Sequence, residues 1–184
     1  DGDGLGDILI SQPSDDDAST NAGKVFLLFG KYLAGATGEV NLEVYHSDYG
    51  VEILGQDNSD WLGDYEGVSA VGDIDGDGLG EILIGAGYDD TKGTDAGEVY
   101  LLFVADLLND HEYGDSILNL DSEYGYKFTA HDSYDHLGFS VASSNDVDGD
   151  GLPDLVMGAP GWAADYGAVY IVSSSTIWMN TLFG

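Results

Sequence analysis

Short apolar segments separated by glycine-rich polar stretches recur along the whole chain. Two clear examples run from Glu98 to Val104 and from Ala168 to Val172, and they consist mainly of Val, Ile, Leu, Tyr and Phe. Such segments, bounded by Gly, Asp, Asn and Ser, are typical of β-strands. No window of about 12 residues sustains the 3.6-residue period of an amphipathic helix, and each of the frequent glycines would weaken a helix by about 1 kcal/mol. The pattern predicts an all-β fold.

The segments belong to a repeated unit. An acidic phrase at Asp73–Ala86 recurs at Asp146–Ala159, and a shortened copy opens the chain at Asp1–Ile10. Two further phrases recur in the same order, one at 22–29, 96–103 and 166–173, and the other at 60–63 and 135–138. Three phrases that recur in the same order and at nearly the same spacing indicate a repeat protein.

Each period contains about four predicted strands, and in the second we expect them near 67–71, 82–86, 98–104 and 117–120. Four short strands per repeat suit the blade of a β-propeller, which buries its faces against neighbouring blades. A β-sandwich would not explain the period. The prediction is a partial propeller of four-stranded antiparallel blades, with a partial first blade at 1–61, a complete second blade at 62–136 and most of a third at 137–184.

The acidic phrase has the composition of a calcium-binding loop. Ca²⁺ takes six to eight oxygen ligands, and acids at alternate positions of a sharp turn supply several of them. Glycine at the sixth position lets the backbone bring the next carbonyl to the ion. The predicted ligands are Asp73, Asp75, Asp77, the Leu79 carbonyl and Glu81 in the second repeat, and Asp146, Asp148, Asp150, the Leu152 carbonyl and Asp154 in the third.

Three alternatives to a calcium-binding β-loop fit the acidic phrase less well. An EF-hand needs a bidentate Glu at position 12 and flanking helices, whereas Ile84 and Met157 stand there, within apolar runs. An acidic turn without metal would place several carboxylates close together with no cation to offset their repulsion. Mg²⁺ suits the number of ligands less well. The first loop is truncated, so its Asp1, Asp3, Leu5 carbonyl and Asp7 are expected to hold calcium more weakly.

The phrases resemble the FG-GAP repeat of integrin α-subunit propellers and related prokaryotic surface proteins. The Phe-Gly pair of that family stands here as Leu62-Gly63 and Leu137-Gly138, and its Gly-Ala-Pro as Gly158-Ala159-Pro160 and, altered, as Gly85-Ala86-Gly87 and Ser11-Gln12-Pro13. The resemblance implies a blade whose calcium loop joins its first two strands, with the ligand face elsewhere. Because family propellers close with seven blades, we expect the remaining blades on a longer parent chain. The isolated segment should then associate or unfold easily.

Charge narrows the classes of partner. The 184 residues include 35 acids against four lysines, at positions 24, 31, 92 and 127, and the formal net charge is −31. No basic patch for nucleic acid or an anionic membrane can be assembled from four cations. The longest apolar run, Val99–Ala105, is far shorter than the ~20 residues of a membrane-spanning helix. An acidic surface of this kind also suggests a high-salt habitat, where screening mutes self-repulsion.

No pattern of catalytic residues supports an enzyme, since the chain has neither cysteine nor a Gly-x-Ser-x-Gly elbow. Loop aromatics either stack on a protein or glycan ligand or pack between blades, and these are Trp61, Tyr65, Tyr88, Tyr134, Trp162 and Tyr166. The leading hypothesis is a calcium-stabilised propeller segment of a secreted or cell-surface protein, active in adhesion or ligand binding. The alternatives are a non-catalytic module of a secreted hydrolase or lyase and a purely structural surface component. Calcium loops of this type bind too weakly to fill in cytosol, which favours an extracellular location.

Overall fold

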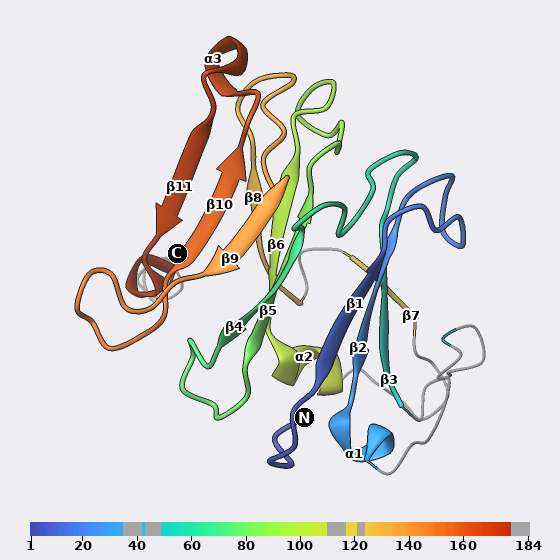
Figure 1. Ribbon diagram of the computed structural model, residues 1–184, viewed down its shortest axis with the longest axis vertical. Helices are drawn as coiled ribbons and strands as arrows, with labels where there is room; N and C mark the ends of the chain where they lie inside the picture. The colour runs from blue at the N-terminus through green and yellow to red at the C-terminus, as the bar shows by residue number, and fades with distance from the viewer. Residues whose placement is uncertain (35–41, 43–48, 110–116, 121–123, 178–184) are drawn as a thin grey trace.

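Three β-sheets stand side by side in the computed structural model of the chain (Figure 1), which describes residues 1–34, 42, 49–109, 117–120 and 124–177. The first sheet has the order β1 (Ile8–Gln12), β2 (Lys24–Leu28), β3 (Gly50–Leu54) and β7 (Ile117–Asn119). The second has the order β4 (Val68–Gly72), β5 (Glu81–Ala86), β6 (Glu98–Leu102) and β8 (Gly125–Thr129). The third consists of β9 (Ser140–Ser143), β10 (Leu155–Ala159) and β11 (Ala168–Val172). Short helices α1 (Gly30–Leu33), α2 (Val104–Asn109) and α3 (Trp162–Asp165) lie in the connections.

The second sheet is the complete repeat, and all its neighbouring strands pair antiparallel. β1 and β2 of the first sheet, and β10 and β11 of the third, repeat its two central strands β5 and β6 with the same antiparallel pairing. The all-β fold and the antiparallel blades of a partial propeller are therefore confirmed. The division of the chain at residues 62 and 137 stays a prediction.

One predicted strand belongs to a different sheet from the one expected, so that prediction is wrong. Residues 117–119 do form a strand, but this strand, β7, pairs parallel with β3 of the first sheet, and β8 is the fourth strand of the second sheet. Gly125 begins β8 where a Cβ would collide with the Leu101 carbonyl, and Gly50 begins β3 in the same contact with Leu27. The recurrence of this glycine was the sequence signal that identifies the fourth strand.

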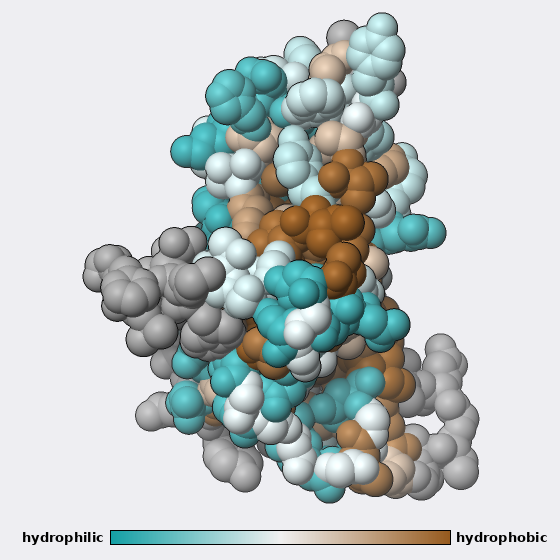
Figure 2. Space-filling model, turned by 90° about the vertical axis from the view of Figure 1, so that its left-hand side faces the viewer, coloured by the Kyte–Doolittle hydropathy of each residue, from teal (hydrophilic) through white to brown (hydrophobic). Residues whose placement is uncertain are grey.

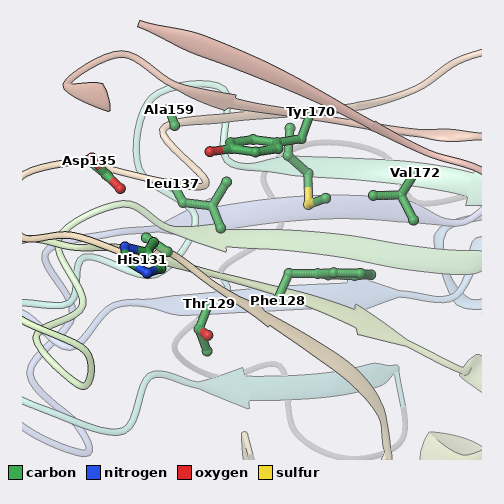
Figure 3. A pocket seen from close by; sticks show the side chains of 10 residues that line it. Phe128, Thr129, His131, Asp135, Leu137, Ala159, Tyr170 and Val172 are labelled. Carbon is green, nitrogen blue, oxygen red and sulfur yellow. The ribbon is translucent and has the colours of Figure 1, made fainter. Parts of the chain in front are cut away.

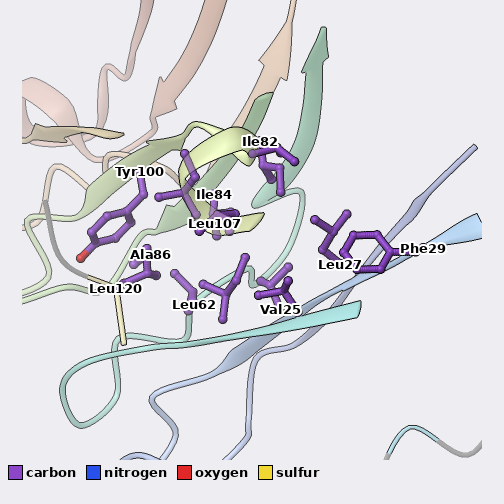
Figure 4. Packing of buried hydrophobic residues seen from close by; sticks show 14 residues of the cluster. Val25, Leu27, Phe29, Leu62, Ile82, Ile84, Ala86, Tyr100, Leu107 and Leu120 are labelled. Carbon is purple, nitrogen blue, oxygen red and sulfur yellow. The ribbon is translucent and has the colours of Figure 1, made fainter. Parts of the chain in front are cut away.

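Two apolar layers lie between the sheets, one on each side of the second sheet. Alternate residues of its central strands point to opposite layers, so that Ile84 and Tyr100 face the first sheet whereas Leu83 and Leu101 face the third. β5 and β6 are consequently buried along their whole length. Figure 4 shows the layer shared by the first and second sheets.

The outer face of the third sheet is exposed where the second sheet is covered. Val169 and Ile171 of β11 are 69% and 59% exposed, whereas the equivalent Val99 and Leu101 of β6 are fully buried. The space-filling view of this side of the molecule shows a continuous apolar area (Figure 2).

No helix in the described part of the chain is long and apolar enough to cross a membrane.

Candidate metal centre

The loop between β4 and β5 wraps around the carboxylate of Asp73. Its two oxygens accept hydrogen bonds from the backbone N–H groups of Gly76, at 2.6 Å, and Gly78, at 3.0 Å. Gly78 has a left-handed backbone with φ of 91°, which a side chain would strain. The N–H of Ile74 donates to Glu81 Oε2 at 2.7 Å and so ties the end of the loop to its beginning.

The loop between β9 and β10 has the same construction. Asp146 accepts from the N–H groups of Gly149, at 2.5 Å, and Gly151, at 2.8 Å, and Asp154 accepts from Val147 at 2.7 Å. Gly151 has φ of 94°, as the predicted turn requires. Two loops 73 residues apart in sequence thus adopt one conformation, each supported by a buried acid, Glu81 at the start of β5 and Asp154 directly before β10.

Three carboxylates converge in each loop. One oxygen from each member of the group lies within 4.8 Å of the other two, and the groups are Asp73 with Asp75 and Glu81, and Asp146 with Asp148 and Asp154. Ligand oxygens that surround Ca²⁺ at 2.3–2.6 Å lie at most about 5 Å apart. The spacing therefore fits a calcium ion.

Glu81 shows most directly that a cation fits. It is 1% exposed, and its Oε1 is buried with no hydrogen-bond partner among the described residues. Burial, with the charges of Asp75, Asp77 and Asp73, raises the pKa of this carboxyl to about 7. A buried acid with an unpaired oxygen and several acidic neighbours is costly unless a cation or a proton compensates it.

Backbone donors and burial move two other pKa values in opposite directions. Hydrogen bonds from Gly151, and also from Gly149 and Asp150, lower the pKa of the Asp146 carboxyl despite some opposing desolvation. Burial raises the pKa of Asp75, assisted by the nearby Asp77 and Asp73 charges. The backbone therefore orients the first position of the loop, and of these two positions the third gains more from a cation.

Two predicted carboxylate ligands lie outside the convergent groups. Asp77 Oδ1 accepts a hydrogen bond from the Leu79 N–H at 2.7 Å, and Asp150 Oδ1 accepts one from Leu152 at 2.8 Å. These bonds shape the turn that carries the two predicted carbonyl ligands. Ligation by Asp77, Asp150 and the carbonyls of Leu79 and Leu152 stays a prediction.

The truncated first loop forms no convergent acidic group among the described residues. Asp7 accepts hydrogen bonds from the amino terminus of Asp1 and from the Gly30 N–H, both at 2.8 Å. Lys31 forms an ion pair with Asp1 at 2.5 Å, and Asp3 Oδ1 accepts from the Leu5 N–H at 2.7 Å. In this loop the side chain of Lys31 supplies a cation beside Asp1.

Aromatic side chains gather at the other ends of the strands. Tyr65 stacks on Phe139 with ring centroids 4.1 Å apart, and Tyr88 packs edge-on against His136 at 5.1 Å. Trp61 approaches Tyr88 at 6.5 Å, so the cluster joins loops of the second and third repeats. These rings thus pack between repeats, although Tyr65 is still 64% exposed. The other predicted loop aromatics lie beyond the cluster and are exposed, Tyr134 at 56%, Trp162 at 41% and Tyr166 at 89%.

Both loops lie in segments with a recognised sequence pattern. The family model described as the FG-GAP repeat matches residues 67–102 and 137–172, which span β4–β6 and β9–β11. The chain carries two FG-GAP repeats. The match confirms the expected resemblance to the FG-GAP repeat, which is a propeller repeat. Integrin α subunits are among the similar proteins, which also agrees with that expectation.

The relatives of this FG-GAP chain are much longer. It is 28% identical over 177 residues to integrin alpha pat-2 of Caenorhabditis elegans, covering 92% of this chain and 13% of the relative. It is 31% identical over 152 residues to human integrin alpha-11, covering 76% of this chain and 11% of the relative. It is 28% identical over 160 residues to phosphatidylinositol-glycan-specific phospholipase D of Bos taurus, covering 86% of this chain and 17% of the relative. The chain therefore spans less than a fifth of the length of these relatives.

Proposed function

We propose that this FG-GAP segment binds Ca²⁺ in the β4–β5 and β9–β10 loops, and that the ions brace a propeller that recognises a protein or glycan ligand outside the cell. The observation that carries the calcium assignment is the buried Glu81 Oε1, which has no hydrogen-bond partner in the described part of the chain and lies beside two converging carboxylates. Asp73, Asp75 and Glu81 would hold one ion, and Asp146, Asp148 and Asp154 the other. Calcium loops with Kd values of about 10⁻⁴ to 10⁻³ M fill only in extracellular concentrations of the ion.

The first prediction tests this directly. Calorimetric titration should give about two Ca²⁺ ions per chain, and calcium at about 100 times Kd should stabilise the fold by about 2.7 kcal/mol per site, or about 5.4 kcal/mol for both sites. In a chain of this size the two sites together correspond to a rise in Tm of about 10–20 °C. The double variant Asp75→Ala with Asp148→Ala should lose both responses.

The matched control changes the same charge elsewhere. Glu66→Ala with Asp132→Ala removes two exposed acids outside the loops and should keep both the stoichiometry and the rise in Tm. Equal stabilisation by Mg²⁺, or an unchanged response of the loop variant, would show that the assignment is wrong.

Ligand recognition is assigned to the aromatic cluster and the loops around it, at the ends of the strands away from the metal loops. Trp61, Tyr65 and His136 have left-handed φ values of 54°, 51° and 55°, which bulky side chains rarely adopt. Backbone strain of this kind is often retained at binding sites. Large, partly exposed rings are also frequent hot spots at protein interfaces.

A second assignment has its own support, because one relative is a phosphatidylinositol-glycan-specific phospholipase D. The segment would then be a non-catalytic propeller module of a secreted hydrolase. The sequence of the parent protein distinguishes the two: a catalytic domain beside these repeats favours this assignment, and adhesion-type repeats favour the first. Both predict that the segment itself lacks hydrolytic activity.

A further inference from the structure

An apolar groove opens between the second and third sheets (Figure 3). Its volume is about 290 Å³, and its floor includes Leu137 and Met157, which are 5% and 2% exposed. Tyr170 lies at the groove and is 40% exposed. Phe128 and Thr129 of β8 line the opposite side.

The internal repeat supplies a filled version of the same groove. Between the first and second sheets, Tyr100 stands where Tyr170 stands, with Ile84 in place of Met157 and Leu62 in place of Leu137. These three side chains belong to one buried cluster (Figure 4), and Tyr100 is only 3% exposed. The two grooves therefore have similar walls but differ in what covers them.

The residue that fills the first groove is Leu120. Its side chain is 2% exposed, belongs to the same cluster and lies beside Ala86 and Tyr100 (Figure 4). Its backbone is attached to β3, because β7 pairs parallel with β3 and the Leu120 N–H donates to the Leu54 carbonyl at 3.4 Å. The counterpart of Leu54 in the second sheet is Thr129, which lines the open groove.

We propose that the groove between the second and third sheets is the docking site for a short β-strand that adds parallel to β8 and inserts a following leucine beside Tyr170. The occupant has the chemistry of Ile117–Leu120, which occupies the equivalent place one repeat earlier. The interval that separates β6 from β7, applied after β11, ends beyond Gly184. The occupant therefore lies outside the printed sequence. Each blade thus uses its connection between the third and fourth strands to cover the joint with the preceding blade. The inference does not depend on calcium.

The probe for this site is a synthetic peptide with the sequence of residues 115–122, labelled with a fluorophore. It should bind the full chain saturably in anisotropy measurements at about 0.5 M salt, which screens the repulsion between acidic partners. A peptide with Leu120→Asp should bind at least about 10-fold more weakly, because a charge would enter an apolar groove. Equal binding of the two peptides would overturn the proposal.

Substitutions on β11 give a matched pair in the protein. Tyr170→Asp alters the wall of the groove and should weaken binding about 10-fold, whereas Val169→Asp lies on the opposite face of the same strand and should change it less than about 2-fold. The reverse order would place the peptide on the outer face of the third sheet and refute the docking site.

Two measurements keep the test independent of how the variants fold. A photo-reactive leucine at the Leu120 position should crosslink to Phe128, Tyr170 or Val172 of the unaltered protein. Appending residues 115–122 after Gly184 through a flexible linker should raise Tm by about 2–6 °C. Crosslinks only to Leu62 or Tyr100, which would mean exchange with the chain's own strand, or an unchanged Tm would contradict the proposal.

Discussion

At the scale of single residues, Asp60 is a buried acid that lies outside the metal loops. It is 2% exposed, and its Oδ1 has no hydrogen-bond partner among the described residues, although Oδ2 accepts from the Asp57 N–H at 2.9 Å. Burial raises its pKa to about 7, and the charges of Asp89, Asp57 and Asp90 act in the same direction. Asp60 lies in the loop whose Trp61 and Leu62 N–H groups bond to the first repeat, so its charge bears on the joint between blades.

The second prediction follows from the sign of that shift. The folded chain binds a proton at Asp60 more tightly than the unfolded chain, whose pKa is near 3.8. The contribution of Asp60 to the free energy of unfolding therefore falls as pH rises from about 4 to about 7, by at most about 1.4 kcal/mol per pH unit, and is constant above pH 7. Asp60→Asn keeps the acceptor for Asp57 and should remove this slope.

The measurement is the free energy of unfolding of both proteins between pH 4 and 8 in saturating calcium. The advantage of Asp60→Asn should grow up to pH 7 and then stay constant. Asp89→Asn removes a charge that raises the pKa of Asp60. This variant should therefore narrow the pH range over which the contribution of Asp60 to stability changes. Parallel profiles for the wild type and Asp60→Asn would show that the buried carboxyl is not protonated near neutrality.

At the scale of strands and loops, the repeat preserves one charge pair with its signs exchanged. In the first sheet the buried Lys24 of β2 faces Glu52 of β3 at 4.0 Å. In the second sheet Glu98 occupies the Lys24 position, and Lys127 of β8 pairs with it at 3.0 Å. The pair thus links the same two strands in both blades, with the cation on opposite strands.

The third prediction uses this exchange. Lys127→Met should destabilise the fold by about 3 kcal/mol, because Glu98 is 1% exposed and would lose its cation. The double variant Glu98→Lys with Lys127→Glu should recover most of that loss, since it recreates the polarity of the first sheet. Chemical denaturation of the single and double variants measures both effects. A double variant less stable than Lys127→Met would mean that the second sheet depends on features other than charge complementarity.

Sequence patterns predicted the elements that carry strong local signals. The apolar runs of β5 and β6 and the glycine-directed turn at Gly78 are set by residues close in the chain, and the structure has them as expected. The partner of β7 could not be predicted, because its few apolar residues suit any sheet edge, and only the three-dimensional position of β3 decides among them. The roles of Asp60 and Glu98 were missed for a similar reason, since their surroundings include residues distant in the sequence, Asp89 for Asp60 and Lys127 for Glu98.

At the scale of the molecule, an exposed apolar face on the third sheet and the negative net charge of the chain have opposite effects on association. Its outer face exposes Val169 and Ile171, whose equivalents in the second sheet are fully buried against the next blade. A face of this kind favours association with a further blade or, in its absence, with a second copy. The net charge of −31 opposes association at low ionic strength. Self-association of the segment should therefore depend on salt, whether or not its acidic surface reflects a high-salt habitat.

The fourth prediction is that the mean molecular mass in sedimentation equilibrium rises as salt increases from about 0.1 to about 1 M, since the Debye length falls from about 10 to about 3 Å. Val169→Lys with Ile171→Lys should keep the chain monomeric at high salt, because two amines then replace the apolar contact. The matched control, Tyr32→Lys with Tyr134→Lys, changes charge equally on exposed rings away from this face and should still associate. If the wild type stays monomeric at about 1 M salt and about 100 μM protein, the exposed apolar face of β11 does not drive association, and the prediction is wrong. If both double variants dissociate alike, added charge and not the loss of this face would be the cause.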